Sequence, residues 1–326
     1  MKEAMFYEKL DNNTVHCLLC PHDCMIKEGK YGFCNVRKNV NGTLNTENYG
    51  IVTAIALDPM EKKPLYHFYP GRYILSVGTF GCNLRCAFCQ NWEISQQKLE
   101  GNFALPEQLI HIAKSQENNI GIAYTYNEPT IWFEYVIECA KAARENGLKN
   151  VLVSNGFINI EPLKELLKYI DAMNIDIKAF TDEYYRKLCY GKLDNVLRTV
   201  EVAAKSCHVE ITTLLVTGEN DNVDEMEKLA KWLSGINKNI PLHFTRYFPH
   251  YKMTNPPTPI ETLKLVSETG KKYLNYVYTG NAPGFDNNTY CPVCGNLLIE
   301  RNININIIGI KNNKCLKCGN EFYGFI

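Results

Sequence analysis

The sequence lacks an excess of charge of either sign, and it lacks any long hydrophobic run. Its 326 residues carry 35 Lys and Arg against 35 Asp and Glu, so the formal net charge is zero. This balance argues against a protein held to nucleic acid or to an anionic membrane by bulk electrostatics. Apolar runs such as residues 51–57 fall far short of the roughly 20 residues that span a bilayer.

The first ten residues, MKEAMFYEKL, contain no continuous apolar segment, so no secretory signal peptide is expected. Cysteine, by contrast, is abundant. Of the 14 cysteines, four lie within residues 17–34, three within 82–89 and four within 291–318. Secreted disulfide-rich proteins spread their cysteines through a small, loop-rich chain. Tight clusters in a chain of ordinary globular composition instead indicate metal sites in a reducing, cytoplasmic compartment.

Residues 73–280 alternate between strand-like and helix-like patterns. An apolar stripe over residues 131–143, followed by Gly147 as a C-terminal cap, is the clearest helix. About six strand–helix units fit, fewer than the eight of a closed barrel of about 250 residues. We therefore predict an α/β fold, a partial (β/α)6 TIM-like barrel with a parallel sheet covered by helices. The candidate strands are residues 73–77, 120–125, 150–154, 172–177, 208–216, 241–247 and 274–278.

Small Cys-rich metal-binding modules are expected at both ends of the barrel. Residues 1–42 form an N-terminal four-Cys module, and residues 43–72 form a strand-rich connector. Residues 73–280 form the barrel, and residues 281–326 form a C-terminal zinc ribbon. In parallel α/β folds, ligands bind at the carboxyl ends of the strands, so the loops that follow the strands are the candidate sites.

The loop after the first barrel strand contains Cys82, Cys86 and Cys89 in a C-x3-C-x2-C arrangement. A closed zinc or iron–sulfur site needs four ligands, and this loop offers three. Three thiolates on a cubane leave one iron open, and an open iron can chelate a substrate or cofactor. Gly81 and short polar neighbours allow backbone N–H groups to turn toward the sulfurs and tune the potential.

In this position, the three-Cys loop resembles the signature of radical S-adenosylmethionine (SAM) enzymes, and the aromatic Phe88 before the third cysteine fits it. The resemblance implies a radical SAM barrel in which Cys82, Cys86 and Cys89 hold a catalytic [4Fe-4S] cluster. It further implies that the open iron binds SAM. One electron then cleaves SAM to a 5′-deoxyadenosyl radical, which abstracts a hydrogen atom from a substrate.

The loops after the later strands extend the resemblance. Tyr126-Asn127-Glu128-Pro129 is similar to the family's Gly-Gly-Glu-Pro loop, which holds the SAM amino group, with Tyr126 and Asn127 in place of the glycines. Each loop also has an ordinary reading as a helix cap, a turn or a surface ion pair. The resemblance to glycyl-radical activating enzymes assigns further SAM contacts to Ser154, Asn155, Gly156, Asp176 and Lys178, and it places Thr212 near the SAM carboxylate. Gly280 and Asn281, which follow the seventh strand, are candidates for a contact with adenine. Thr212 stands where that subfamily often has Arg.

The flanking segments narrow the resemblance to radical SAM enzymes of the AmmeMemoRadiSam system, relatives of pyruvate formate-lyase activating enzymes. This implies an oxygen-sensitive oxidoreductase that takes electrons from an external donor such as flavodoxin or ferredoxin. The substrate is a small molecule or a protein residue, and activation of a glycyl-radical enzyme is one specific alternative. The segments that carry this narrower resemblance are residues 17–24, 29–34, 58–67, 89–92, 242–249 and 291–295.

The two flanking cysteine groups differ in their spacing. Cys291, Cys294, Cys315 and Cys318 form two C-x2-C pairs, typical of a zinc ribbon whose closed tetrahedral site is structural. The N-terminal group suits either a structural zinc or an auxiliary [4Fe-4S] cluster. Its spacing is looser than the C-x2-C-x2-C run of ferredoxins, which favours zinc. The N-terminal ligands are Cys17, Cys20, Cys24 and Cys34.

His67, His243 and Arg246 are candidates for the substrate pocket. His243 and Arg246 lie three apart on one strand, so only one of them can face the barrel interior. The ordinary reading of a lone histidine is a hydrogen-bonded core residue. Cys139, Cys189 and Cys207 are also read as core. An alternative of another class is a non-catalytic metal-binding or electron-transfer scaffold, which would neither bind nor cleave SAM.

Overall fold

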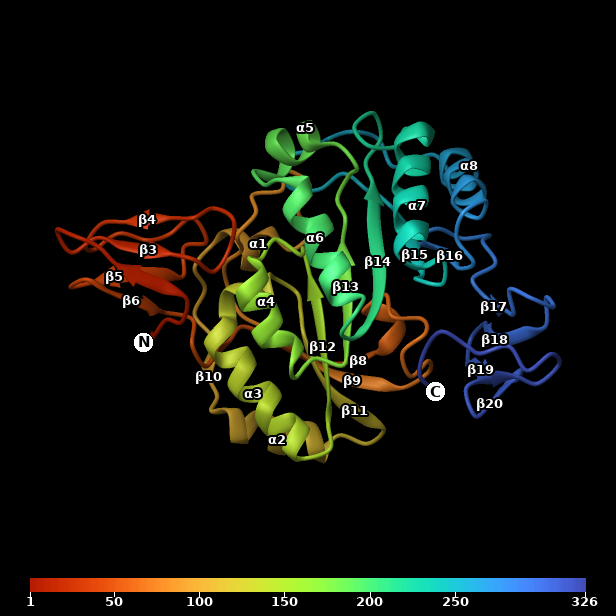
Figure 1. Cartoon of the computed structure of the whole chain (residues 1–326), viewed down its shortest axis with the longest axis horizontal. Coiled ribbons are helices and arrows are strands. Elements are labelled where there is room, and N and C mark those ends of the chain that lie inside the picture. The colour runs from red at the N-terminus through yellow and green to blue at the C-terminus, as the bar shows by residue number, and fades with distance from the viewer.

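An eight-stranded sheet curves through the centre of the computed structural model, which describes residues 1–326 (Figure 1). Seven parallel strands follow one another in chain order, and β8 (Ala54–Pro59) pairs antiparallel with the first of them. The two edge strands do not pair, so the sheet is an open, partial barrel as predicted. The parallel strands are β9 (Tyr73–Gly78), β11 (Asn119–Tyr124), β12 (Lys149–Ser154), β13 (Ala172–Asp176), β14 (His208–Leu215), β15 (Leu242–Arg246) and β16 (Val277–Gly280).

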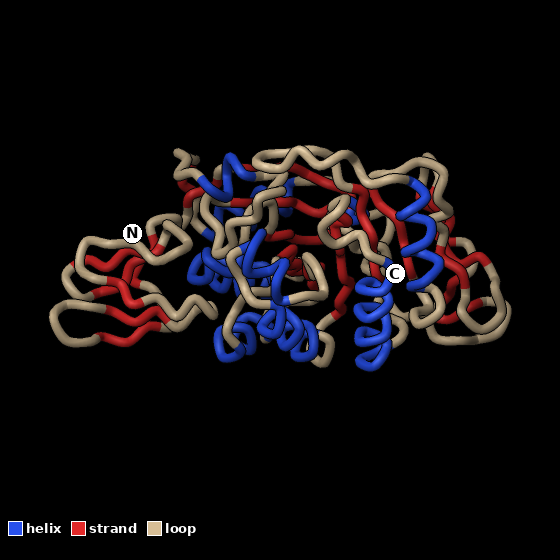
Figure 2. The backbone as a smooth tube through the Cα atoms, turned by 90° about the horizontal axis from the view of Figure 1, so that it is seen from above, coloured by secondary structure: helices blue, strands red, loops and turns tan.

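Helical segments connect successive parallel strands and pack on the outer face of the sheet (Figure 2). The predicted apolar stripe is buried on α3, and Gly147 beyond that helix has a φ of 73°. The last strand begins three residues later than predicted, because the Leu274 amide still bonds to the Gly270 carbonyl at the end of α8. The helices are α2 (Pro106–Ser115), η2 (Pro129–Trp132), α3 (Phe133–Glu145), α4 (Ile160–Leu167), α5 (Asp182–Tyr184), the π-helical η3 (Tyr185–Cys189), α6 (Leu193–Ala203), α7 (Val223–Asn237) and α8 (Ile260–Gly270).

The segment 58–69, which includes η1 (Met60–Lys62), fills the lower part of the barrel. Met60, Leu65 and Phe68 are buried there. The Asn174 side chain on β13 donates a 2.8 Å hydrogen bond to the Pro64 carbonyl. The chain's own connector therefore closes the barrel interior at the end opposite to the carboxyl ends of the strands. The strand residues that pack against the segment are Ile74, Ala123, Val151 and Ala172.

The N-terminal module contains two small antiparallel sheets at one end of the molecule (Figure 1). The expected boundary at residue 42 falls in the turn of a hairpin, so residues 43–46 belong to one of these sheets. The first sheet consists of β1 (Lys2–Glu3), β6 (Thr43–Thr46) and β5 (Arg37–Val40). The second consists of β2 (Tyr7–Lys9), β3 (Val15–Cys17) and β4 (Met25–Ile26). Nearby, β7 (Ile51–Val52) pairs with β10 (Asn102–Phe103), and α1 is Trp92–Gln96.

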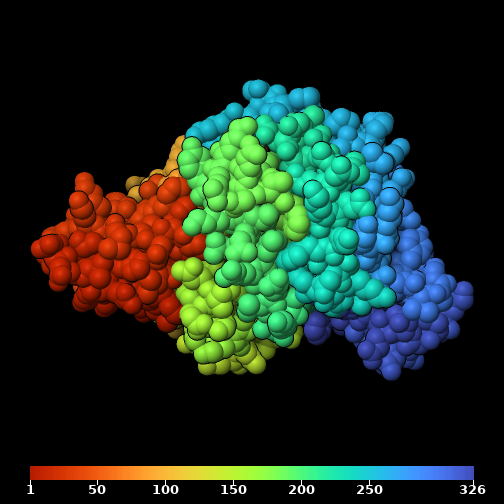
Figure 3. Space-filling view, turned by 45° about the horizontal axis from the view of Figure 1, so that its top comes forward, coloured from red at the N-terminus to blue at the C-terminus, as the bar shows by residue number.

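The C-terminal module lies at the opposite end of the molecule (Figures 1 and 3). Its last residues return to the barrel, where the Phe325 amide donates to the His67 carbonyl and the Phe325 carbonyl accepts from the Tyr69 amide, both at 2.8 Å. None of the helices has the length and apolar character needed to cross a membrane. The module's strands are β17 (Thr289–Tyr290), β18 (Leu297–Arg301), β19 (Ile305–Ile307), β20 (Ile310–Lys311) and β21 (Lys314–Cys315).

Candidate active site

The three-Cys loop connects β9 to α1 at the carboxyl end of the sheet. Cys86 is buried, whereas Cys82 and Cys89 are partly exposed. Gly81 has a φ of 91°, and a Cβ there would lie 2.9 Å from the Cys34 carbonyl oxygen. Only glycine fits this position, because the loop is pressed against the N-terminal module.

Polar groups surround the sulfurs of this loop. The Leu84 amide donates to Cys82 Sγ at 3.3 Å, and Asn155 Nδ2 donates to the same sulfur at 3.7 Å. Cys89 Sγ and Ser95 Oγ lie 3.2 Å apart. The three sulfurs do not gather within 4.8 Å of one another, as ligands of a single ion would. Three thiols at this wider spacing, with N–H donors aimed at one of them, fit an iron–sulfur cluster.

The middle of the loop is fixed by the end of η3. The Arg85 amide donates to the Cys189 carbonyl at 2.8 Å, and the Ala87 amide donates to the Leu188 carbonyl at 2.9 Å. Cys189 is fully buried, in keeping with its reading as a core residue, and it also lies close to Cys86. The sequence carried no signal for this contact, because about a hundred residues separate the two cysteines.

Glu128 joins the loops that follow β11 and β12. Its Oε1 accepts from the Thr130 amide at 3.0 Å and from Ser154 Oγ at 2.8 Å, and its Oε2 accepts from the Asn155 amide at 2.8 Å. Burial raises the pKa of Glu128, and these hydrogen bonds oppose that rise. The carboxylate caps η2, as the ordinary reading held, and it lies beside Cys82. It retains lone pairs that an ammonium group could use.

Tyr126 and Asn127 replace the two glycines of the family's loop. Tyr126 has a φ of 71°, so it adopts the left-handed conformation that glycine would supply. Its hydroxyl donates to Asp58 Oδ2 at 2.6 Å, which directs the ring toward the connector. Asn127 accepts from the Thr79 amide at 3.2 Å and donates to the Gly81 carbonyl at 2.8 Å. Asn127 therefore holds the start of the three-Cys loop.

Asp176 is the last residue of β13, and it forms an ion pair of 2.7 Å with Lys178 just beyond the strand. Burial opposes the charge on Lys178, but Asp176 and Cys86 outweigh burial and raise the pKa of the ammonium group. The exposed fractions of the Lys178 and Asp176 side chains are 17% and 31%. The pair is thus a partly buried ion pair beside Cys86.

The remaining predicted SAM contacts occupy different environments. Thr212 pairs with Asp176 across β13 and β14, and its buried Oγ1 has no hydrogen-bond partner. Gly280 ends β16, and Asn281 after it is exposed. The Phe88 ring is buried with its centroid 5.7 Å from that of Tyr184. Ser154 and Gly156 form a tight turn in which the Gly156 amide donates to Ser154 Oγ at 3.0 Å.

Of the three candidate substrate residues, His67 and His243 share one buried network. His67 Nε2 lies 2.7 Å from the Tyr278 hydroxyl, and its Nδ1 lies 2.7 Å from the Tyr323 carbonyl oxygen. Burial lowers the pKa of His67 to about 3. Arg246 instead donates to the Thr258 carbonyl at 2.8 Å. His67 thereby connects the barrel to the C-terminal module. It is a hydrogen-bonded core residue, the ordinary interpretation of a lone histidine.

Glu210 on β14 is the centre of this network, and sequence analysis missed it. The carboxylate is fully buried and accepts from His208 Nε2 at 3.0 Å and from His243 Nε2 at 2.7 Å. It also accepts from the amides of Tyr66 and His67 at 3.0 and 2.7 Å. A glutamate inside a predicted parallel strand was the available signal, since such strands are buried on both faces.

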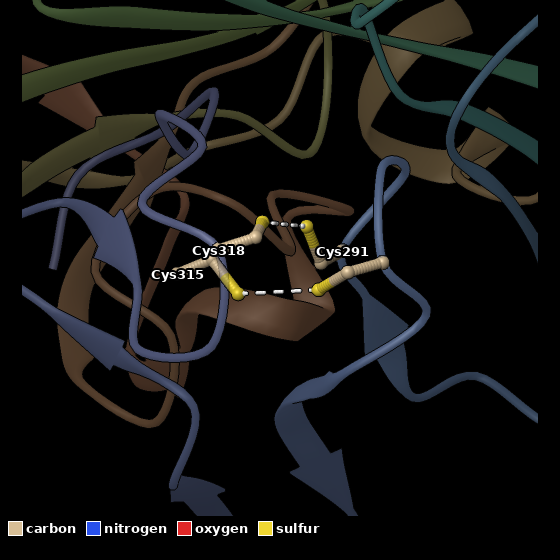
Figure 4. A group of neighbouring side chains, drawn as sticks. Cys291, Cys315 and Cys318 are labelled. Carbon is tan, nitrogen blue, oxygen red and sulfur yellow. Dashed lines mark hydrogen bonds between the residues drawn. The ribbon is translucent and has the colours of Figure 1, made fainter.

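The C-terminal cysteines form the one tight thiol group in the molecule (Figure 4). All four sulfurs lie within 4.8 Å of one another. The Cys291–Cys318 sulfurs are 3.6 Å apart and the Cys294–Cys315 sulfurs are 3.7 Å apart. Four metal–sulfur bonds of about 2.3 Å in a tetrahedron place sulfurs about 3.8 Å apart. The group therefore has the dimensions of a site for a single four-coordinate ion.

Residues 76–233 match the family described as the radical SAM superfamily. The chain is 47% identical to the protein MJ0808 of Methanocaldococcus jannaschii over 98% of both chains. It is 28% identical to the pyruvate formate-lyase-activating enzyme of Clostridium pasteurianum, over 48% of this chain and 75% of that enzyme. Streptococcus suis SuiB bound to S-adenosylmethionine has a TM-score of 0.53 at 15% identity, over 66% of this chain and 53% of SuiB. The likeness to SuiB concerns the fold alone.

Proposed function

Because the chain belongs to the radical SAM superfamily, we propose that Cys82, Cys86 and Cys89 hold a [4Fe-4S] cluster at which this enzyme cleaves SAM. When bound, the cluster supplies the electron that divides SAM into methionine and a 5′-deoxyadenosyl radical, which takes a hydrogen atom from the substrate. The observation that carries the proposal is a loop of three thiols at the carboxyl end of the first barrel strand, not closed to the dimensions of a single-ion site. The test is formation of 5′-deoxyadenosine by the anaerobic, reduced protein supplied with SAM.

The side chains around the loop can bind and orient SAM. Glu128 offers a carboxylate for the ammonium group, and its bonds to Ser154 and Asn155 fix its position. Thr212 contributes a buried hydroxyl without a partner, which suits a donor to the SAM carboxylate. Lys178 places a cation beside Cys86, where it favours a negatively charged cluster. The protein's part is orientation, electrostatics and the exclusion of water.

The substrate is a small molecule or a protein residue. The likeness to an enzyme named as a pyruvate formate-lyase activator supports, as a second candidate, the activation of a glycyl-radical enzyme. Both candidates require an external electron donor of the flavodoxin or ferredoxin kind and a reducing, cytoplasmic setting. Because segment 58–69 closes the barrel from below, the substrate enters from the carboxyl ends of the strands.

Replacing Glu128 by Ala should weaken SAM binding by roughly 10- to 150-fold, the cost of losing a charge-assisted hydrogen bond of about 1.5–3 kcal/mol. The iron content should stay unchanged, since Glu128 is not a cluster ligand. Isothermal calorimetry on the reconstituted protein measures the affinity. Ser154→Ala is the matched control, because it removes one neutral donor to Glu128 and should have a smaller effect. Unchanged affinity in Glu128→Ala would leave Glu128 with only its capping role.

We also propose that the C-terminal thiols bind zinc, because their spacing suits one tetrahedral ion. The double substitution Cys291→Ala with Cys294→Ala should remove about one zinc per chain and leave the iron content unchanged. Elemental analysis by mass spectrometry measures both metals. Cys207→Ala controls for the loss of a thiol outside the clusters. Iron in place of zinc at this site, or full zinc in the double variant, would contradict the assignment.

A further inference from the structure

The four N-terminal cysteines meet in one place although they come from separate loops. The hairpin of β3 and β4 sets Cys17 opposite Cys24, with the Cys17 amide donating to the Cys24 carbonyl at 2.9 Å. Cys20 lies in the loop between them and neighbours the other three thiols, including Cys34 from the turn before β5. Three of the four are less than 9% exposed, and Cys24 is partly exposed. Four thiols thus face a common, mostly buried space.

Two sulfurs of this group are met by N–H donors. The Phe33 amide lies 3.5 Å from Cys24 Sγ, and the Arg37 guanidinium lies 3.9 Å from Cys17 Sγ. Arg37 is 1% exposed and pairs with the equally buried Glu134. Donors and a buried cation aimed at sulfur stabilise negatively charged metal thiolates.

The spacing of the sulfurs distinguishes between the two alternatives that the sequence left open, a structural zinc and a [4Fe-4S] cluster. The C-terminal thiols have closed to the distances of a single tetrahedral ion. No three of the N-terminal thiols lie within 4.8 Å of one another, and the same holds for Cys82, Cys86 and Cys89. The N-terminal group, like the catalytic loop and unlike the C-terminal group, has therefore not closed to the dimensions of a single tetrahedral ion. This geometry favours a multi-iron cluster over the zinc that the sequence spacing alone favoured.

The N-terminal group also lies directly against the catalytic loop. The Cys34 carbonyl oxygen lies against Gly81, the residue before Cys82, because a Cβ atom on Gly81 would lie only 2.9 Å from that oxygen. His22 Nε2 lies 2.7 Å from the Asn83 carbonyl oxygen. The Arg85 guanidinium donates to the Phe33 carbonyl and lies 4.7 Å from the Phe33 ring centroid. Sequence neighbours of the N-terminal cysteines thus contact sequence neighbours of the cysteines in the catalytic loop. The C-terminal module is at the far end of the molecule (Figure 3).

We propose that Cys17, Cys20, Cys24 and Cys34 hold a second [4Fe-4S] cluster, through which electrons reach the catalytic cluster. This inference rests on the proposed function. A low-potential flavin or iron–sulfur protein gives one electron to the N-terminal cluster and is itself oxidised. The N-terminal cluster returns to its oxidised state when that electron passes to the catalytic cluster. No bond is made or broken and no proton is required until SAM is cleaved.

Metal content and electron paramagnetic resonance (EPR) of the full-length, anaerobically reconstituted protein test the site. The wild type should contain about eight irons and one zinc. The triple variant of Cys82, Cys86 and Cys89 to Ala should keep about four irons and a reduced-cluster signal that SAM does not alter. A triple variant with two zincs and no iron would overturn the N-terminal cluster. Should that variant fail to fold, the reduced wild type decides the matter: about two spins per chain support the proposal, and about one overturns it.

The relay is tested with two reductants. In Cys24→Ser, SAM cleavage driven by reduced flavodoxin should fall by about tenfold or more, while cleavage driven by dithionite stays near that of the wild type. Dithionite is small enough to reach the partly exposed catalytic loop directly. The relay would be overturned if Cys24→Ser changed both rates, each relative to the wild type, to the same extent. Absence of cleavage by the wild type under either reductant, with about four irons retained in the triple variant, would instead overturn the proposed function alone.

Discussion

Replacing Cys86 by Ala is expected to abolish the conversion of SAM to 5′-deoxyadenosine. A cubane that lacks one of its three protein ligands loses the site-differentiated iron to which SAM would bind. Cys82→Ala and Cys89→Ala should have the same effect, although both residues are partly exposed and Cys86 is buried. Chromatography with mass spectrometry of the reduced, anaerobic reaction mixture measures the product.

Two buried or half-buried thiols supply the controls for this experiment. Cys139→Ala removes a fully buried thiol from α3, and Cys207→Ala removes a half-buried thiol that follows α6. Both variants should keep their iron and their cleavage activity, because neither residue belongs to a cysteine cluster. Undiminished cleavage by Cys82→Ala, Cys86→Ala or Cys89→Ala would show that the three-Cys loop is not the catalytic site.

Replacing Glu210 by Ala is expected to lower the free energy of unfolding by about 3–5 kcal/mol, the usual cost of breaking a buried charged network. The substitution leaves His208, His243 and the two amides of the connector without their acceptor. The midpoint temperature of thermal unfolding should fall by about 10 °C. Differential scanning calorimetry of the anaerobic holoprotein measures the shift.

The control for Glu210→Ala is Glu161→Ala, which removes an exposed partner of Lys164 and should cost less than about 1 kcal/mol. The pH dependence gives a second readout. Burial opposes the charge on Glu210, but hydrogen bonds from His208 and His243 outweigh it and hold the pKa well below its usual range. The contribution of Glu210 to stability is therefore complete above the unfolded pKa of about 4.3 and is lost as the pH falls below that value. A wild type and a Glu210→Ala variant of equal stability at neutral pH would contradict this role.

The order of the barrel strands and the place of the three-Cys loop could be predicted from the sequence. Both depend on local patterns: the change between strand and helix periodicity, and a spacing of three cysteines within eight residues. The C-terminal metal group followed from two C-x2-C pairs for the same reason. Contacts within a loop or between adjacent elements leave a signal in the sequence because their residues are near neighbours along the chain.

The interior of the barrel could not be predicted, because its contacts join distant parts of the chain. Glu210 bonds to amides about 143 residues earlier, and the hydroxyl of Tyr126 reaches Asp58. Alternation along a strand predicts which face a side chain occupies, but it does not predict which segment covers that face. Nothing in the local pattern of residues 58–69 indicates that they enter the barrel.

The metal at the N-terminal group could not be predicted for a related reason. The sequence gives the number of residues between ligands, whereas the choice of metal depends on the distances between sulfurs and on what surrounds them. Arg37 and Glu134 lie 97 residues apart, yet they form the buried ion pair beside Cys17. The contact of Cys34 with Gly81 likewise appears only when the chain is folded.

Electron–nuclear double resonance of the reduced wild-type protein tests the central claim most directly. The sample is mixed with SAM that carries 15N in its amino group and 17O in its carboxylate. An open iron at Cys82, Cys86 and Cys89 predicts hyperfine coupling of both nuclei to a reduced cluster, and that coupling should be absent from the triple variant. A reduced cluster spectrum without coupling to either nucleus would contradict the assignment of this loop as the SAM-binding site.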